Sequence, residues 1–178
     1  MSSASTQSAP IESAEPNVVV RGPSLADGAA MWELVRSTEV LELNTCYAYL
    51  LLSTHFADTC LVAEAGGQIV GFVAAYRPPT QPRAIFVWQI AVSEEARGQG
   101  LGKRLLNELI DLPACADVTH LTATVTPSNQ PSVRLFTSFA RERGVWCERA
   151  PGLAATDFGP LEHEAEELFQ IGPLRRNT

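Results

Sequence analysis

The chain has 178 residues, of which 46% are hydrophobic, and it carries a net charge of −7 with Lys103 as its only lysine. A chain of this length forms one domain that buries about 70% of its unfolded surface, so it needs neither a metal nor a disulfide to fold. The acidic balance argues against nucleic acid, which requires a basic face, and permits a small cationic partner.

The N-terminal segment is too polar to fold by itself. Residues 1–16 are rich in Ser, Ala, Pro and Glu, which predicts a disordered tail. One domain is expected over residues 17–174, with a loose C-terminal end at 175–178. A short strand is predicted at 18–21. Ser24 offers a helix cap before apolar residues at helical spacing, and a second helix is expected from about Tyr47.

A β-hairpin is predicted next, because residues 61–64 and 69–76 flank the turn signal Gly66-Gly67. Residues 85–92 are almost entirely apolar, as in a central strand with both faces buried. A helix from about Gly100, a strand at 121–125, a helix capped by Ser128 or Asn129, and strands at 145–149 and 165–171 follow. This order predicts an α/β or α+β domain with a mixed sheet.

Cysteine and histidine usage predicts no metal site. The four cysteines and three histidines are scattered, with no C-x-x-C pair. Unpaired cysteines are typical of a reducing cytoplasm. The sequence shows no signal peptide and no apolar run of membrane-spanning length, so a cytoplasmic location without a membrane partner is expected.

The most informative segment joins the central strand to the next helix. Its glycines let the backbone approach a ligand without an obstructing Cβ. The first N–H groups of a helix lack internal partners and lie at the positive end of its dipole. Together these properties predict a pyrophosphate site. The residues expected to form it are Ile90, Ala91, Val92, Arg97, Gly98, Gln99, Gly100, Leu101, Gly102 and Lys103, with Arg104 adding charge.

Two common phosphate motifs do not fit this loop. A Walker loop has Gly-Lys-Ser/Thr, whereas Leu101 follows Gly100, and the glycine spacing differs from the dinucleotide fingerprint. The pattern Arg97-x-x-Gly100-x-Gly102 resembles instead the coenzyme A signature of the GNAT superfamily. The resemblance implies a GNAT fold, with a central, mixed, mostly antiparallel twisted sheet flanked by helices, and acetyl-CoA as co-substrate without a metal.

A second segment, about thirty residues downstream, resembles the other GNAT element. It contains Asn129, Ser132 and Phe136, and the resemblance implies that the asparagine and the aromatic residue flank the pantetheine arm and thiol. Many GNAT enzymes carry a tyrosine at the position of Phe136, where it protonates the leaving thiolate. Phe136 has no proton to donate, so water, another tyrosine, or unassisted departure of the thiolate remains open.

The rest of the chain resembles one GNAT family, the L-2,4-diaminobutyrate acetyltransferases of ectoine biosynthesis. The resemblance spans about residues 18–174 and is carried by residues 41–52 (LELNTCYAYLLL), 59–60, 71–76, 86–89, 124–129 and 163–169. It implies transfer of an acetyl group to the 4-amino (γ) group of a small cationic amino acid, by direct attack in a ternary complex. It also implies a homodimer.

The same resemblance places six residues around the amine substrate. They are Glu42, Asn44, Tyr47, Trp88, His163 and Glu166. Either Glu42, where aspartate is expected, or Glu166 is predicted to pair with the α-ammonium, and Trp88 to pack on the methylene groups. Asn44 and backbone N–H groups are candidates for the α-carboxylate. The catalytic candidates are Glu166, Tyr47, His163 and the backbone N–H of Ile90.

Other interpretations stay open at this point. A GNAT enzyme for another amine, such as a polyamine or a protein N-terminus, fits the CoA motifs equally well. A CoA-binding regulatory domain without catalysis is supported only by Phe136. Trp88 on a buried strand is often a core residue, and Glu164, Glu166 and Glu167 are also typical of a charged sheet edge.

Overall fold

The computed structural model describes residues 17–38 and 41–174, so the predicted N-terminal tail and C-terminal end lie outside the described residues. Seven strands form one sheet in the order β1-β2-β3-β4-β5-β7-β6. The strands are β1 (Val19–Arg21), β2 (Cys60–Ala65), β3 (Gln68–Tyr76), β4 (Ala84–Val92), β5 (His120–Val125), β6 (Trp146–Pro151) and β7 (Glu167–Gly172). The helices are α1 (Gly28–Thr38), α2 (Cys46–His55), α3 (Leu101–Asp111) and α4 (Gln130–Glu142).

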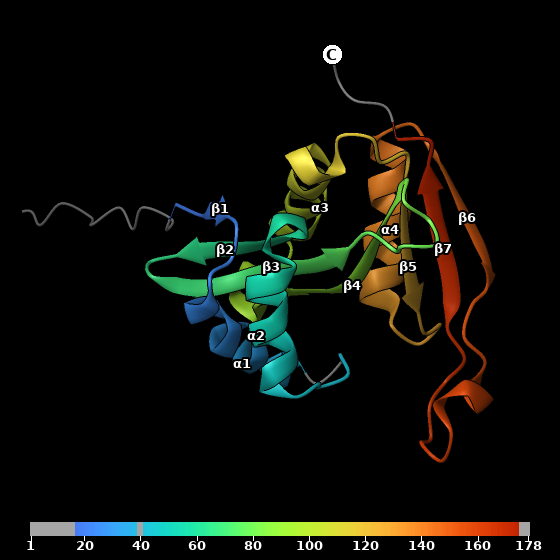
Figure 1. Ribbon diagram of the computed structural model, residues 1–178, viewed down its shortest axis with the longest axis horizontal. Coiled ribbons are helices and arrows are strands. Elements are labelled where there is room, and N and C mark those ends of the chain that lie inside the picture. Colours follow the sequence, from blue (N-terminus) through green and yellow to red (C-terminus); the bar gives the residue numbers. More distant parts are fainter. Residues whose placement is uncertain (1–16, 39–40, 175–178) are drawn as a thin grey trace, which may run out of the picture.

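The helices cover both faces of the sheet (Figure 1). Helices α1 and α2 pack on one face, around a first core that includes Met31, Val35, Tyr49, Phe72 and Ala74. Helices α3 and α4 pack on the other, around a second core that includes Val73, Ile85, Leu105, Leu121, Phe139 and Phe169. Alternate residues of β3 therefore enter different cores, which explains the continuous apolar run of this strand. The predicted mixed, mostly antiparallel sheet is confirmed, since only β4 and β5 pair in parallel.

Several strand boundaries differ by one or two residues from the sequence prediction. The predicted cap at Ser24 precedes a 3-10 turn at residues 25–27, and α1 itself begins directly after this turn at Gly28. Asp27 holds this turn by accepting hydrogen bonds from the Ser24 N–H at 2.7 Å and from its hydroxyl at 2.9 Å. The last strand begins at Glu167 rather than 165, because residues 152–166, here called the arm, form a loop that leaves the sheet.

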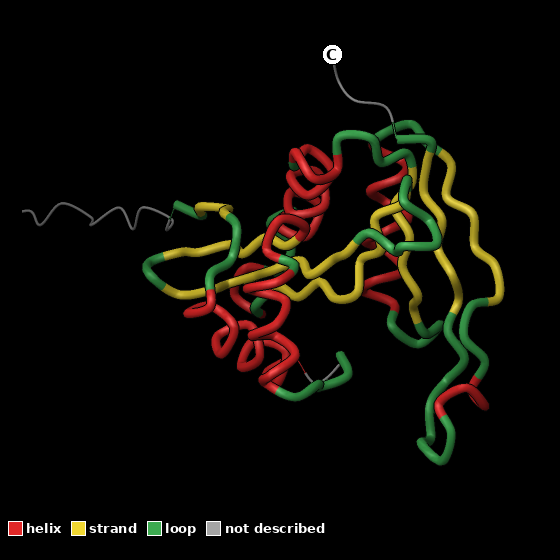
Figure 2. The backbone as a smooth tube through the Cα atoms, in the orientation of Figure 1, coloured by secondary structure: helices red, strands yellow, loops and turns green. Residues whose placement is uncertain are grey.

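The parallel strands β4 and β5 separate after a short contact. They pair only at Ala84–His120, Ile85–Leu121 and Phe86–Thr122. Beyond Phe86, β4 continues beside β3 and β5 continues beside β7, and residues 87–92 have no strand partner on the β5 side among the described residues. Figure 2 shows the two strands diverging. The sheet is therefore split on one side, and the two exposed strand edges face each other across the opening.

A β-bulge occurs at the point where the strands separate. The register pairs Ala74 with Gln89 and Ala75 with Val87, so Trp88 has no partner on β3. The extra residue reverses the alternation of side chains along β4. Trp88 and Gln89 consequently both lie on the α1–α2 face, where Trp88 packs against the first core.

Candidate active site

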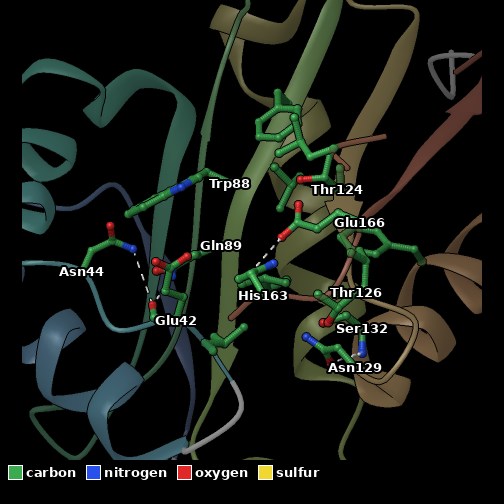
Figure 3. Close-up of a pocket in the computed structure, with 18 of the residues that line it drawn as sticks. Glu42, Asn44, Trp88, Gln89, Thr124, Thr126, Asn129, Ser132, His163 and Glu166 are labelled. Carbon is green, nitrogen blue, oxygen red and sulfur yellow. Dashed lines mark hydrogen bonds and ion pairs between the residues drawn. The ribbon is translucent and has the colours of Figure 1, made fainter. Parts of the chain in front are cut away.

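A cavity of about 360 Å³ lies in the opening between β4 and β5 (Figure 3). Five parts of the chain line it: the α1–α2 loop, the end of β3, β4, the β5–α4 segment and the arm. The lining residues are Leu41, Glu42, Asn44, Tyr76, Phe86, Val87, Trp88, Gln89, Ile90, Ala123, Thr124, Val125, Thr126, Asn129, Ser132, Phe136, Leu153, Phe158, His163 and Glu166. This space is the acceptor cavity below.

A second cavity of about 190 Å³ adjoins the first and leads towards the start of α3. Both cavities share the lining residues Leu41, Ile90, Asn129 and Ser132. This smaller space, the donor cavity, is lined further by Thr38, Ala91, Val92, Arg97, Pro131 and Leu135. The charges differ between the two: the described lining of the acceptor cavity has two carboxylates and no Lys or Arg, and that of the donor cavity has one arginine and no carboxylate.

The glycines before α3 form an open cradle. Gly98 and Gly100 have φ of +77° and +78°, and a Cβ added at either would meet nothing within 4 Å. Gly100 is the N-cap residue, so the N–H groups that follow point outward without helical partners. This open, positively polarised helix start fits the pyrophosphate of coenzyme A.

The basic residues predicted at this cradle divide into two groups. Arg97 lines the donor cavity, and its Nε donates to the Val92 carbonyl at 3.2 Å. Lys103 forms an ion pair with Glu142 of α4. Arg104 pairs with Glu108 at 2.8 Å. Of the three, only the Arg97 side chain lines the donor cavity, whereas the other two are engaged along α3 and with α4.

The segment from β5 to α4 supplies the wall between the two cavities. Asn129 caps α4 by accepting a hydrogen bond from the Ser132 N–H at 3.1 Å, which settles the choice between Ser128 and Asn129. Phe136 is 2% exposed and lies 5.9 Å from the ring of Phe169, centroid to centroid. It presents an apolar ring to the acceptor cavity, at the position where many GNAT enzymes carry a tyrosine hydroxyl.

The arm brings His163 and Glu166 to the acceptor cavity. Its neck is closed by backbone hydrogen bonds between Gly152 and Glu166 at 2.9 Å and between Glu166 and Leu153 at 2.8 Å. The His163 ring stacks on Phe158 with 3.7 Å between centroids, and its Nδ1 lies 2.6 Å from the Glu164 carbonyl. That contact requires a proton on Nδ1, so the neutral ring has a lone pair on Nε2.

His163 and Glu166 face each other within the cavity wall (Figure 3). The distance from His163 Nε2 to Glu166 Oε1 is 3.9 Å, and both side chains are largely shielded from solvent. Ser128 ties the arm to the α4 side, because its backbone N–H and its hydroxyl donate to Glu164 at 3.2 and 2.5 Å. This arrangement holds the Nε2 atom of an imidazole beside a carboxylate.

The α1–α2 loop supplies Glu42 and Asn44 from the opposite side of the cavity. Their backbone carbonyls are fixed by side chains: Gln89 Nε2 donates to the Glu42 carbonyl at 2.9 Å, and Trp32 Nε1 donates to the Asn44 carbonyl at 3.0 Å. The Glu42 residue itself is exposed at the mouth. The two acidic side chains of the cavity therefore come from the α1–α2 loop and the arm.

The two tyrosines of α2 differ in position. Tyr47, predicted at the active site, is 66% exposed and lines neither cavity. Tyr49 is fully buried, and its hydroxyl donates to Gln89 Oε1 at 2.8 Å. Trp88 lies 5.9 Å from Tyr49, centroid to centroid, so it contributes to the first core and to the cavity wall at once.

Several lining residues were not identified from the sequence. Gln89 is the clearest, and a polar residue within the apolar run 85–92 was the available signal. Thr124 at the end of β5 and Thr126 just after it also line the cavity, and their alternation with buried residues was a weaker signal. Tyr76 and Phe158 carried no local signal, because β3 and the arm reach the cavity only through the tertiary fold.

The sequence of this domain is similar to that of a known protein family. Residues 29–140 match the Acetyltransferase (GNAT) family, which covers more than half of the chain. The chain belongs to the GNAT acetyltransferase family. The opening between β4 and β5, the glycine cradle and the α4 cap all lie within the residues that this family match covers.

Within the GNAT family, this domain is similar to proteins named as diaminobutyrate acetyltransferases. It is 46% identical over 156 residues to L-2,4-diaminobutyric acid acetyltransferase of Bordetella parapertussis, covering 87% of this chain and 84% of that protein. Identity to the protein of that name from Halalkalibacterium halodurans is 43% over 166 residues, covering 93% and 87%. A solved diaminobutyrate acetyltransferase from Paenibacillus lautus, in complex with its substrate L-2,4-diaminobutyric acid and coenzyme A, superposes with a TM-score of 0.86 at 43% identity, covering 92% and 99%.

Neither a metal-ligand cluster nor a membrane-spanning helix occurs among the described residues. Within residues 17–38 and 41–174, no three His, Cys, Asp or Glu side chains gather as a metal site would require. Across those same ranges, every helix is too short or too polar to cross a bilayer.

Proposed function

We propose that the protein transfers the acetyl group of acetyl-CoA to the 4-amino group of L-2,4-diaminobutyrate. The observation that carries the proposal is the junction of the two cavities. A carboxylate-lined acceptor cavity meets an arginine-lined donor cavity at the exposed edge of β4. The first matches a diamine with net positive charge, and the second matches a phosphorylated thioester. The Paenibacillus lautus enzyme, solved with L-2,4-diaminobutyric acid and coenzyme A, supports this assignment.

The donor side is assigned to the cradle and the two strand edges. The N–H groups at the start of α3 and the Arg97 guanidinium hold the pyrophosphate. Asn129 and the unpaired edge of β4 from residue 87 hold the pantetheine arm as an added strand would be held. Bound acetyl-CoA supplies a thioester whose carbonyl carbon is the electrophile.

The acceptor side is assigned to the groups that face each other across the cavity. Glu166 and Glu42 pair with the ammonium groups of the substrate, and Trp88 packs on its methylene groups. His163 Nε2 accepts the proton lost by the 4-ammonium, directly or through one water, and the carboxylate of Glu166 at 3.9 Å stabilises the imidazolium that results. Asn44 is assigned to the α-carboxylate.

The β4 backbone is assigned to charge stabilisation. Ile90 lines both cavities at their junction, and its N–H donates to the carbonyl oxygen of the acetyl group as negative charge develops there. Phe136 provides an apolar wall and no proton, so the departing thiolate is protonated by water or by Tyr76, a phenol that also lines the acceptor cavity. Holding both reactants at this junction contributes about 7–11 kcal/mol in favourable cases.

Regioselectivity is the test of this assignment. The α-amine loses its proton more readily, so reaction at the 4-amine requires the α-ammonium to be held charged in an ion pair. Replacing the correct carboxylate by an amide, as in Glu42→Gln or Glu166→Gln, keeps the shape and removes the charge. The cost is about 2–5 kcal/mol of substrate recognition for a buried pair. Some α-acetyl product is also expected.

NMR of the products from Glu42→Gln, Glu166→Gln and Trp88→Ala measures both effects. Glu162→Gln is the matched control, because Glu162 is exposed on the arm and does not line the cavity. Wild-type affinity and pure 4-acetyl product from all three site variants would show that the acceptor site lies elsewhere. No acetylated diaminobutyrate from the wild-type protein would overturn the proposed function.

The wider assignments rest on the family. They comprise a role in ectoine biosynthesis and osmoprotection, a cytoplasmic location, and a homodimer without a nucleic-acid or membrane partner. Relatives named L-2,4-diaminobutyric acid acetyltransferase, at 43–46% identity, support the acetyl transfer on which the role in ectoine biosynthesis depends. Sedimentation of the full chain tests the dimer. It also bears on Tyr47, which is 66% exposed in the single chain and stays a candidate for substrate binding.

A further inference from the structure

A buried chain of hydrogen bonds connects α2 to the backbone of the acceptor loop, residues 41–45. The Tyr49 hydroxyl donates to Gln89 Oε1 at 2.8 Å, and Gln89 Nε2 donates to the Glu42 carbonyl at 2.9 Å. Tyr49 is 0% exposed and Gln89 is 7% exposed. Both polar side chains thus belong to one buried chain of hydrogen bonds that ends on the loop carrying a cavity carboxylate.

The direction of this chain is fixed by chemistry. Burial raises the pKa of the Tyr49 phenol above its ordinary value of 10.0, so the hydroxyl keeps its proton and acts as a donor. An amide that accepts at its oxygen presents its N–H₂ group on the other side. Gln89 therefore has its nitrogen towards the loop in this arrangement, and the carbonyl of Glu42 is the acceptor it meets.

Two features of the fold place this chain at the cavity. The bulge at Trp88 turns Gln89 onto the α2 face, where Tyr49 stands. A second side chain, Trp32 of α1, donates to the Asn44 carbonyl at 3.0 Å. The acceptor loop is therefore held at two carbonyls by side chains from β4 and α1, although it contains no regular structure of its own.

We propose that Tyr49 and Gln89 are positioning residues for the amine substrate, which act by holding the Glu42 backbone against β4. The inference rests on the proposed function in one respect: the substrate whose binding it governs is the diamine. Neither side chain needs to touch the reacting atoms. Their effect passes through the position of the Glu42 carboxylate, so it falls on binding of the amine and not on binding of acetyl-CoA.

The test uses Tyr49→Phe, which removes one hydroxyl and keeps the ring contacts with Phe72 and Trp88. KM for diaminobutyrate should rise about five- to tenfold, the worth of one hydrogen bond, while KM for acetyl-CoA stays within about twofold. Ser53→Ala is the matched control. This substitution removes a buried α2 hydroxyl that donates to the Tyr49 backbone carbonyl at 2.8 Å. That hydroxyl does not contact the acceptor loop. Both KM values should then stay near wild type.

Two further measurements separate positioning from general destabilisation. In a Glu42→Gln background, Tyr49→Phe should raise KM for the amine less than twofold, because both changes act through one group. The indole N–H of Trp32 reports the loop without any substrate, since it donates to Asn44. Its proton resonance should move in Tyr49→Phe and stay in place in Ser53→Ala.

The outcomes divide clearly. An unmoved Trp32 resonance together with a wild-type KM in Tyr49→Phe would overturn the inference. Equal changes in Ser53→Ala, or full additivity with Glu42→Gln, would do the same. If the wild-type protein does not acetylate diaminobutyrate, the proposed function fails, whereas the Trp32 resonance still decides whether Tyr49 and Gln89 hold the loop.

Discussion

Replacing Gly100 by alanine tests the cradle at the start of α3. Gly100 has φ of +78°, and an added Cβ meets nothing within 4 Å, so no steric clash opposes the substitution. Its folding cost is the left-handed backbone alone, about 1–2 kcal/mol. In a domain of this size that corresponds to a fall in Tm of about 2–8 °C. Valine would add the strain of a β-branched side chain and obscure the result.

The functional cost of Gly100→Ala has a different origin. The methyl group stands at the N-cap, beside the first N–H groups of α3 that we propose to bind the pyrophosphate. Losing one hydrogen bond to a charged group costs about 1.5–3 kcal/mol, which is about a ten- to hundredfold rise in KM for acetyl-CoA. KM for the amine should change little, because the site proposed for the amine is the other cavity.

Gly67→Ala is the control for this experiment. Gly67 lies in the β2–β3 turn with φ of +80°, and its added Cβ also meets nothing within 4 Å. The two variants should lose similar stability in thermal unfolding. Only Gly100→Ala should show the raised KM in steady-state assays with varied acetyl-CoA. Equal KM values in both variants would refute the placement of the pyrophosphate at this loop.

Two other predictions concern pH and covalent chemistry. Hydrogen bonding from Arg21 lowers the pKa of Asp27 from 3.8 to about 2, so this carboxylate stabilises the fold above about pH 4 and the contribution is lost as pH falls towards 2. With Arg21 38% exposed, Asp27→Asn should cost about 1–2 kcal/mol in urea unfolding at pH 7, and the difference from wild type should narrow near pH 2. Cys46→Ser should keep most activity, with no acetyl-enzyme by intact mass in the absence of amine.

Each of these has a contrary result. A constant Asp27→Asn deficit between pH 7 and pH 2 would mean that the side chain stabilises the turn without its charge. An added acetyl group on Cys46 would replace direct transfer by a two-step route through the thiol.

The sequence by itself determined the features that depend on neighbouring residues. The cradle follows from glycines before a helix, and the cap of α4 is a contact between Asn129 and Ser132, three residues apart. The hairpin turn at Gly66-Gly67 and the apolar central strand were also predicted, because turn chemistry and hydrophobic patterns are local. Motif order then identified the family.

The contacts that individual side chains make with distant residues could not be predicted from the sequence. Lys103 carries the charge expected at the cradle, yet it binds Glu142, which is 39 residues away. Tyr47 and Tyr49 lie two residues apart and thus about 200° apart around α2, so only one of them faces the core. The helix is apolar on both sides, so its sequence does not indicate which of the two tyrosines is buried.

Only the tertiary structure decided how the acceptor cavity is built. The separation of β4 from β5, the bulge at Trp88 and the return of the arm to β5 are all set by strand register between distant segments. One extra residue in β4 moves Gln89 to the opposite face, and no local pattern encodes such a shift. The sequence determines the chemistry of each side chain, whereas the packing of the sheet determines the distances between them.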